Sequence, residues 1–83
     1  MTKKELIENI EEHFSLAESF DNCPDVNERV NNCEIAIDLT KEYLLKYKTP
    51  YKHKYMGSNV AFNEAMIEVM KDMIIDARIF NNE

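Results

Sequence analysis

The residue types best suited to binding chemistry gather in one basic, aromatic segment, residues 46–55. This segment holds four of the ten Lys and Arg residues and three of the four tyrosines, and it contains no carboxylate. Lysine ammonium groups bind phosphates and tyrosine rings stack on bases, while the same lysines can contact the carboxylates of an acidic protein. The predicted partner- or anion-binding residues are Lys48, Tyr51, Lys52, His53, Lys54 and Tyr55.

The composition of the whole chain weighs against nucleic acid as the main ligand. The formal net charge is −6 and the pI is about 4.9, and no familiar nucleic-acid-binding motif accompanies the segment. Three interpretations of the segment are open. The most favoured is structural, because lysines near a helix C-terminus stabilise the helix dipole and tyrosines beside Pro50 can hold a loop against the core. The next is binding to the acidic surface of a partner protein, and the last is binding to a nucleotide or single-stranded nucleic acid.

A second candidate surface is acidic. Glu64, Glu68, Asp72 and Asp76 follow one another at intervals of four residues. Like charges at this spacing destabilise a helix by roughly 0.2–0.5 kcal/mol per pair. The row therefore indicates either a solvated face or a face that meets a basic partner. The same arrangement recurs earlier in the chain as Glu34, Asp38 and Glu42.

Two isoleucines lie on the acidic side of the same predicted helix. Ile75 and Ile79 project away from the side that carries Phe62 and Phe80, so they cannot share a core with them. Burial of each would contribute roughly 1.5–3 kcal/mol. Since three helices leave no further element to cover this pair, we expect another chain to cover it, most simply in a symmetric homodimer. The predicted oligomer or partner interface consists of Ile75, Ile79, Asp72 and Asp76.

The sequence offers no pattern typical of catalysis or metal binding. Neither His13 nor His53 has a ligand-like spacing to another His, Cys or carboxylate. A single glycine excludes a glycine-rich phosphate loop. We therefore expect a protein that is not an enzyme, with no catalytic residue, no metal and no cofactor.

Size and composition predict one soluble domain spanning residues 1–83. Cys23 and Cys33 are too far apart along the predicted elements for a disulfide, which favours reduced thiols. Neither a signal peptide nor a membrane span is expected, and the predicted location is the cytoplasm. The excess of lysine over arginine and the frequent asparagines are typical of A/T-rich coding sequences, as in many phages and low-GC bacteria.

Three amphipathic segments predict the elements that position these residues. Thr2 and Glu5 form a capping box that begins a helix over about residues 3–21. Asp25 caps a helix over about 26–48, whose two apolar sides indicate neighbours on both sides and hence a central position. Ser58 or Asn59 is expected to cap a third helix over about 59–81.

The predicted fold is all-α, a compact three-helix bundle. Residues 50–57 are expected to form a loop, a 3₁₀ turn or a short extra helix.

The sequence thus favours a small non-enzymatic protein-binding module, an accessory regulator or inhibitor that docks on a partner protein. One alternative is a binder of an anionic nucleotide ligand or single-stranded nucleic acid through residues 46–55. A second alternative is a structural subunit that assembles with itself.

Overall fold

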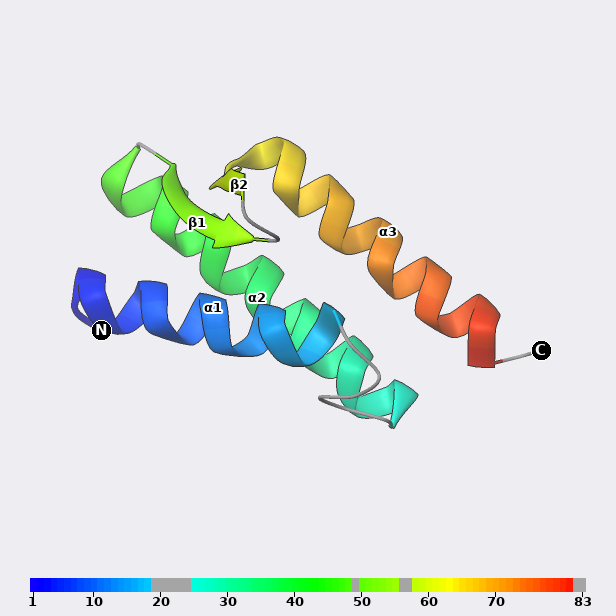
Figure 1. The fold of residues 1–83 in the computed structure, drawn as a ribbon. Helices are drawn as coiled ribbons and strands as arrows, with labels where there is room; N and C mark the ends of the chain where they lie inside the picture. Colours follow the sequence, from blue (N-terminus) through cyan, green and yellow to red (C-terminus); the bar gives the residue numbers. More distant parts are fainter. Residues whose placement is uncertain (19–24, 49, 56–57, 82–83) are drawn as a thin grey trace.

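The computed structural model describes residues 1–18, 25–48, 50–55 and 58–81, with the side chains of residues 54, 55, 58 and 81 excepted. In chain order its elements are α1 (Lys3–Glu18), α2 (Val26–Tyr47), β1 (Tyr51–Tyr55), β2 (Ser58–Phe62) and α3 (Glu64–Asn81). The predicted helical fold is thus confirmed in outline, with a small two-stranded antiparallel sheet in addition, so the all-α class is incomplete. Figure 1 shows the three helices, with α2 crossing α1, and with α3 running in the opposite direction to α2.

Helix α1 begins at the predicted capping box. The backbone N–H of Thr2 donates to the Glu5 carboxylate at 3.2 Å, and the N–H of Glu5 donates to Thr2 Oγ1 at 3.1 Å. These hydrogen bonds favour the charged carboxylate and lower the pKa of Glu5. The last predicted residues of this helix, 19–21, lie outside the described part of the chain. Its buried face consists of Leu6, Ile10, Phe14 and Ala17.

Helix α2 is central, as its two apolar sides predict, and it packs against both α1 and α3. It begins at Asp25, whose side chain accepts the N–H of Glu28 at 3.1 Å. It ends at Tyr47, because Lys48 turns into the left-handed region at φ 55° and donates its N–H to the Leu44 carbonyl. Its buried residues are Cys33, Ala36, Ile37, Thr40 and Tyr43.

The connection between α2 and α3 is a β-hairpin, and the predicted loop, turn or helix at residues 50–57 is wrong. Strand β1 pairs antiparallel with β2 in a register that sets Tyr51 opposite Phe62 and His53 opposite Val60. These segments form strands because their sequences alternate with a period of two: Tyr51 and His53 flank Lys52, and Val60 and Phe62 flank Ala61. This alternation places one side of each strand against the helices.

Helix α3 begins at Glu64, so the prediction of a helix from residue 59 with a cap at Ser58 or Asn59 is also wrong. Asn63 is the cap: its side-chain oxygen accepts the N–H of Met66 at 3.1 Å, and its carbonyl accepts the N–H of Ile67 at 3.2 Å.

The later start of α3 changes the membership of the core. Phe62 lies on β2 and is fully buried. Its ring stacks on that of Tyr51, with 5.0 Å between the ring centroids, and makes a T-shaped contact with Phe14 at a centroid distance of 5.1 Å. The buried face of α3 is centred on Met70, so Val69 and Phe80 point away from it and are about half exposed. The expected place of Phe80 in the core, on the same side as Phe62, is therefore wrong. Among the described residues, no helix is long and apolar enough to cross a membrane.

Candidate interaction surface

The basic segment predicted from the sequence is divided between the end of α2 and strand β1. Lys48, at the C-cap of α2, and Lys52, in the middle of β1, are both exposed. Lys54 and Tyr55 belong to β1, opposite Asn59 and Ser58, but their side chains lie outside the description. The structure thus leaves two described lysines of the predicted site at the surface.

Tyr51 lies in the core and not at the surface. Its ring is only 8% exposed and lies between Phe62 and Tyr43, whose ring centroids are 5.0 and 5.3 Å away. Burial, together with the nearby Glu11 carboxylate, raises the pKa of its hydroxyl well above the ordinary value. A ring covered on these sides cannot stack on a nucleic-acid base.

His53 has a structural contact as well. Its Nδ1 lies 3.3 Å from a carboxylate oxygen of Glu11, and its ring is nearly perpendicular to that of Phe62, with 5.9 Å between the ring centroids. The side chain is about one quarter exposed. His53 therefore joins β1 to α1, and little of it is available to a ligand.

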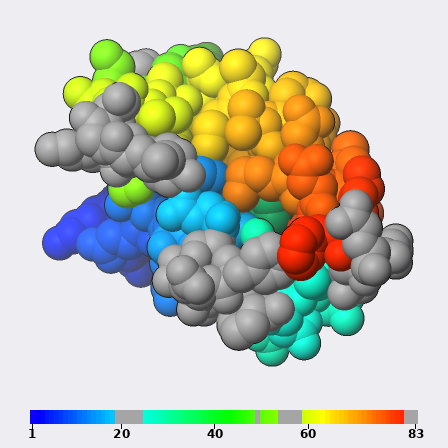
Figure 2. Space-filling view, turned by 45° about the vertical axis from the view of Figure 1, so that its right-hand side comes forward, coloured from blue at the N-terminus to red at the C-terminus, as the bar shows by residue number. Residues whose placement is uncertain are grey.

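The predicted aliphatic pair lies at the surface. Ile75 is 53% exposed and Ile79 is 54% exposed, and the side chains of Asp72 and Asp76 beside them are exposed too. Helix α3, coloured yellow to red, forms a continuous stretch of the molecular surface in Figure 2. All four predicted interface residues thus lie together on one exposed helix.

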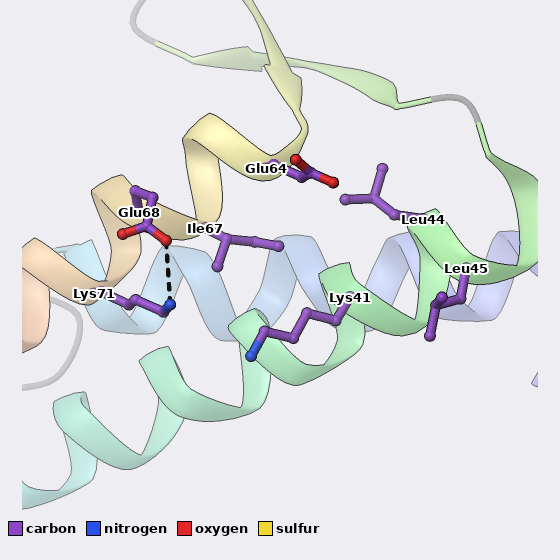
Figure 3. A pocket seen from close by; sticks show the side chains of 7 residues that line it. All are labelled: Lys41, Leu44, Leu45, Glu64, Ile67, Glu68 and Lys71. Carbon is purple, nitrogen blue, oxygen red and sulfur yellow. Dashed lines mark hydrogen bonds and ion pairs between the residues drawn. The ribbon is translucent and has the colours of Figure 1, made fainter.

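A groove of about 490 Å³ runs between α2 and α3 near the start of α3. Ile67 points from α3 towards α2, and Leu44 extends from α2 towards Glu64 (Figure 3). Leu45, on the α2 side, is 80% exposed. The groove therefore has an apolar base and charged rims, and its full lining is Lys41, Leu44, Leu45, Glu64, Ile67, Glu68 and Lys71.

The groove and the isoleucine pair belong to one face of the molecule. At about 100° per residue, the positions 64, 68, 71, 75 and 79 fall within an arc of roughly 80° on α3. On α2, the positions 34, 38 and 45 fall within roughly 40° of one another. Arg78 reaches from α3 to Glu34 on α2, with 3.7 Å between their charged atoms. We call this surface the α2–α3 face, and it comprises Glu34, Asp38, Lys41, Leu45, Glu64, Glu68, Lys71, Asp72, Ile75 and Ile79.

Three members of this face were missed by reasoning from sequence: Leu45 and the lysines Lys41 and Lys71. The signal for Leu45 was present, because it directly follows Leu44 and adjacent helical residues lie about 100° apart. Both leucines could not face one narrow core. The two lysines carry no such signal, since a lone lysine on a helix is usually solvated.

The side chains of the described residues that could bind a metal or act as a nucleophile form no metal site, and the described cysteine is buried. No group of three or more His, Cys, Asp or Glu side chains among them could hold a metal ion. Cys33 is buried and its Sγ lies 3.1 Å from the Met70 carbonyl oxygen. Burial raises the pKa of this thiol to about 11, so it is protonated and unreactive at neutral pH.

Comparisons with known proteins identify no relative: no family model matches the chain, and neither a curated protein nor a solved structure matches it significantly.

Proposed function

We propose that this chain is a small non-enzymatic module that binds another protein through the α2–α3 face. It would act as an accessory regulator or inhibitor of the protein on which it docks. The observation that carries the proposal is the exposure of three large aliphatic side chains on this face: Leu45 lines the groove at one end, and Ile75 and Ile79 lie toward the other end. Exposed apolar surface with polar surroundings is typical of protein interaction sites.

The energetics favour coverage of this face by a partner. Full burial of a Leu or Ile side chain contributes roughly 1.5–3 kcal/mol. About half of the surface of Ile75 and Ile79 and most of that of Leu45 are still exposed. A partner that covers this surface would gain the corresponding part of that free energy. Isolated exposed aliphatics need no explanation, but three on one face with an apolar groove between two helices do.

The experiment is capture from a lysate of the organism that encodes the chain, with the purified protein as bait. The variant Ile75→Asp/Ile79→Asp should lose the captured partner. The control Lys3→Gln/Lys4→Gln makes the net charge more negative by the same two units at exposed positions of α1, away from the α2–α3 face, and should retain it. Equal capture by all three baits would refute the α2–α3 face as the binding surface.

The competing hypothesis is nucleic-acid binding through residues 46–55; of its two predicted stacking residues, Tyr51 lies in the core and the side chain of Tyr55 lies outside the described part of the chain. Its remaining described basis is the exposed pair Lys48 and Lys52 on a chain of net charge −6. We therefore expect a 20-nucleotide oligothymidine to show no saturable binding at 150 mM salt. Saturable binding that Lys52→Ala weakens would favour the nucleic-acid hypothesis over the proposal.

A further inference from the structure

We propose that the occupant of the α2–α3 face is one amphipathic helix of the partner, with a central apolar stripe and Lys or Arg on both flanks. This inference rests on the proposed function, because it names the chemistry of the partner that this same face takes. The shape of the face, the spacing of its aliphatic side chains and the charge of its rims carry the argument.

The shape fits a helix. Helices α2 and α3 run side by side in opposite directions, with Leu44 near Glu64 at one end and Glu34 near Arg78 at the other. At about 1.5 Å per residue, α3 offers a length of roughly 27 Å. A partner helix of about five turns matches this length.

The spacing of the exposed side chains fits a helix too. Along α3 the positions 64, 68, 71, 75 and 79 repeat at intervals of four and three residues, which is the pattern by which one helix packs on another. The two last positions are isoleucines, whereas the first three are Glu64, Glu68 and Lys71, which line the groove together with Leu45 of α2. A partner helix along this row would cover apolar side chains at both ends of the face.

The charge of the rims selects a basic partner. Each side of the face carries a row of exposed carboxylates at intervals of four residues. These rows are Glu34, Asp38 and Glu42 on α2, and Glu64, Glu68 and Asp72 on α3.

Cations of this chain neutralise the rows only in part. Lys71 is 3.2 Å from Glu68, Lys46 is 3.7 Å from Glu42, and Arg78 is 3.7 Å from Glu34. Such exposed pairs contribute little and exchange readily with a new cation. Within the described part of the chain, Asp38, Glu64 and Asp72 have no ion pair. The rims therefore have carboxylates available for Lys or Arg on both flanks of a docked helix.

The same charges argue against a second copy of this chain as the occupant. A symmetric dimer brings identical patches together. Through the α2–α3 face it would place acidic rows against acidic rows, between molecules that each carry a net charge of −6. The carboxylates around Ile75 and Ile79 therefore disfavour the homodimer that the isoleucine pair alone predicts.

The test uses a fluorescein-labelled 18-residue peptide of leucine and lysine, with leucines at helical spacing and lysines at all other positions. Fluorescence anisotropy at 150 mM NaCl should show saturable binding to the protein. A leucine and glutamate peptide with the same apolar pattern should bind at least tenfold more weakly. Ile75→Asp and Leu45→Asp should each weaken binding of the Leu/Lys peptide at least tenfold.

The aspartate variants separate docking from simple charge attraction, because each makes the protein more acidic. If the peptide were held by net charge alone, Ile75→Asp would bind it equally well or more tightly, and the inference would be wrong. Equal binding of both peptides would contradict it too, as would sedimentation of the wild type as a dimer that Ile75→Asp dissociates. If the Leu/Lys peptide does not bind while capture of a partner from the lysate still depends on Ile75 and Ile79, the inference is refuted and the proposed function stands.

Discussion

At the scale of single residues, the structure converts a predicted binding residue into a core residue. Tyr51 was selected because lysines surround it in the sequence, yet its ring lies among Tyr43 and Phe62. The alternation of β1 explains the difference, since Tyr51 and Lys52 point to opposite sides of the strand. The charged neighbours of a residue therefore do not determine its own environment in a strand.

Tyr51 leads to a prediction about stability and pH. Its hydroxyl is buried and has no hydrogen-bond partner among the described residues. Because an unpaired buried hydroxyl is unfavourable, Tyr51→Phe should raise the free energy of unfolding at pH 7 by up to about 1 kcal/mol. Urea titration measures this, and Tyr47→Phe, in the same aromatic cluster, is the control.

The same substitution should change the alkaline limit of stability. The folded state raises the pKa of Tyr51, so folding favours the neutral hydroxyl. That contribution is complete below the unfolded-state pKa of about 10 and is lost as the pH rises above it. Between about pH 9 and about pH 11, a range that brackets the unfolded-state pKa of about 10, the wild type should thus lose more stability than Tyr51→Phe. A loss of stability at pH 7 in Tyr51→Phe would contradict a hydroxyl without a hydrogen-bond partner, and identical alkaline slopes would contradict its burial.

At the scale of elements, the helices were predictable where a capping signal and a long apolar period agreed. Thr2 with Glu5 and Asp25 with Glu28 mark helix starts that the structure confirms. The start of α3 was not predictable in this way, because Asn59 and Asn63 are both good capping residues. The choice between them depends on the hairpin, whose pairing with a buried Phe62 is a tertiary interaction.

The candidate surface was predictable only in part for the same reason. Ile75 and Ile79 could be assigned to the outer side of α3 from helical periodicity alone. The groove beside them depends on how α2 packs against α3, which no local pattern specifies. Leu45 and Lys41 therefore joined the surface only once the two helices were placed together.

The position of the α3 cap can be tested directly. Asn63→Ala removes the side-chain oxygen that accepts the N–H of Met66, so it should lower the free energy of unfolding by about 1 kcal/mol. Asn59→Ala, at an exposed position of β2, should change it by less than about 0.5 kcal/mol. Chemical denaturation followed by circular dichroism compares the two. A larger loss in Asn59→Ala would show that α3 begins near residue 59.

At the scale of the whole molecule, the predicted basic site and the exposed aliphatic side chains lie in different places. The described basic residues of the predicted site lie on β1 and at the end of α2, whereas Leu45, Ile75 and Ile79 lie with two acidic rows on the α2–α3 face. Apolar contact supplies affinity, and the carboxylates select partners of the opposite charge. This division is the reason to place the partner on the α2–α3 face and not on the hairpin.

The most direct test of this placement is an NMR titration of the ¹⁵N-labelled protein with the unlabelled Leu/Lys peptide. We predict that the amide signals of Leu45, Lys71, Ile75 and Ile79 shift together and saturate, while those of the outer side of α1 and of Lys52 stay in place. Shifts centred on β1, or spread evenly over all acidic positions of the molecule, would contradict the α2–α3 face as the site of protein binding.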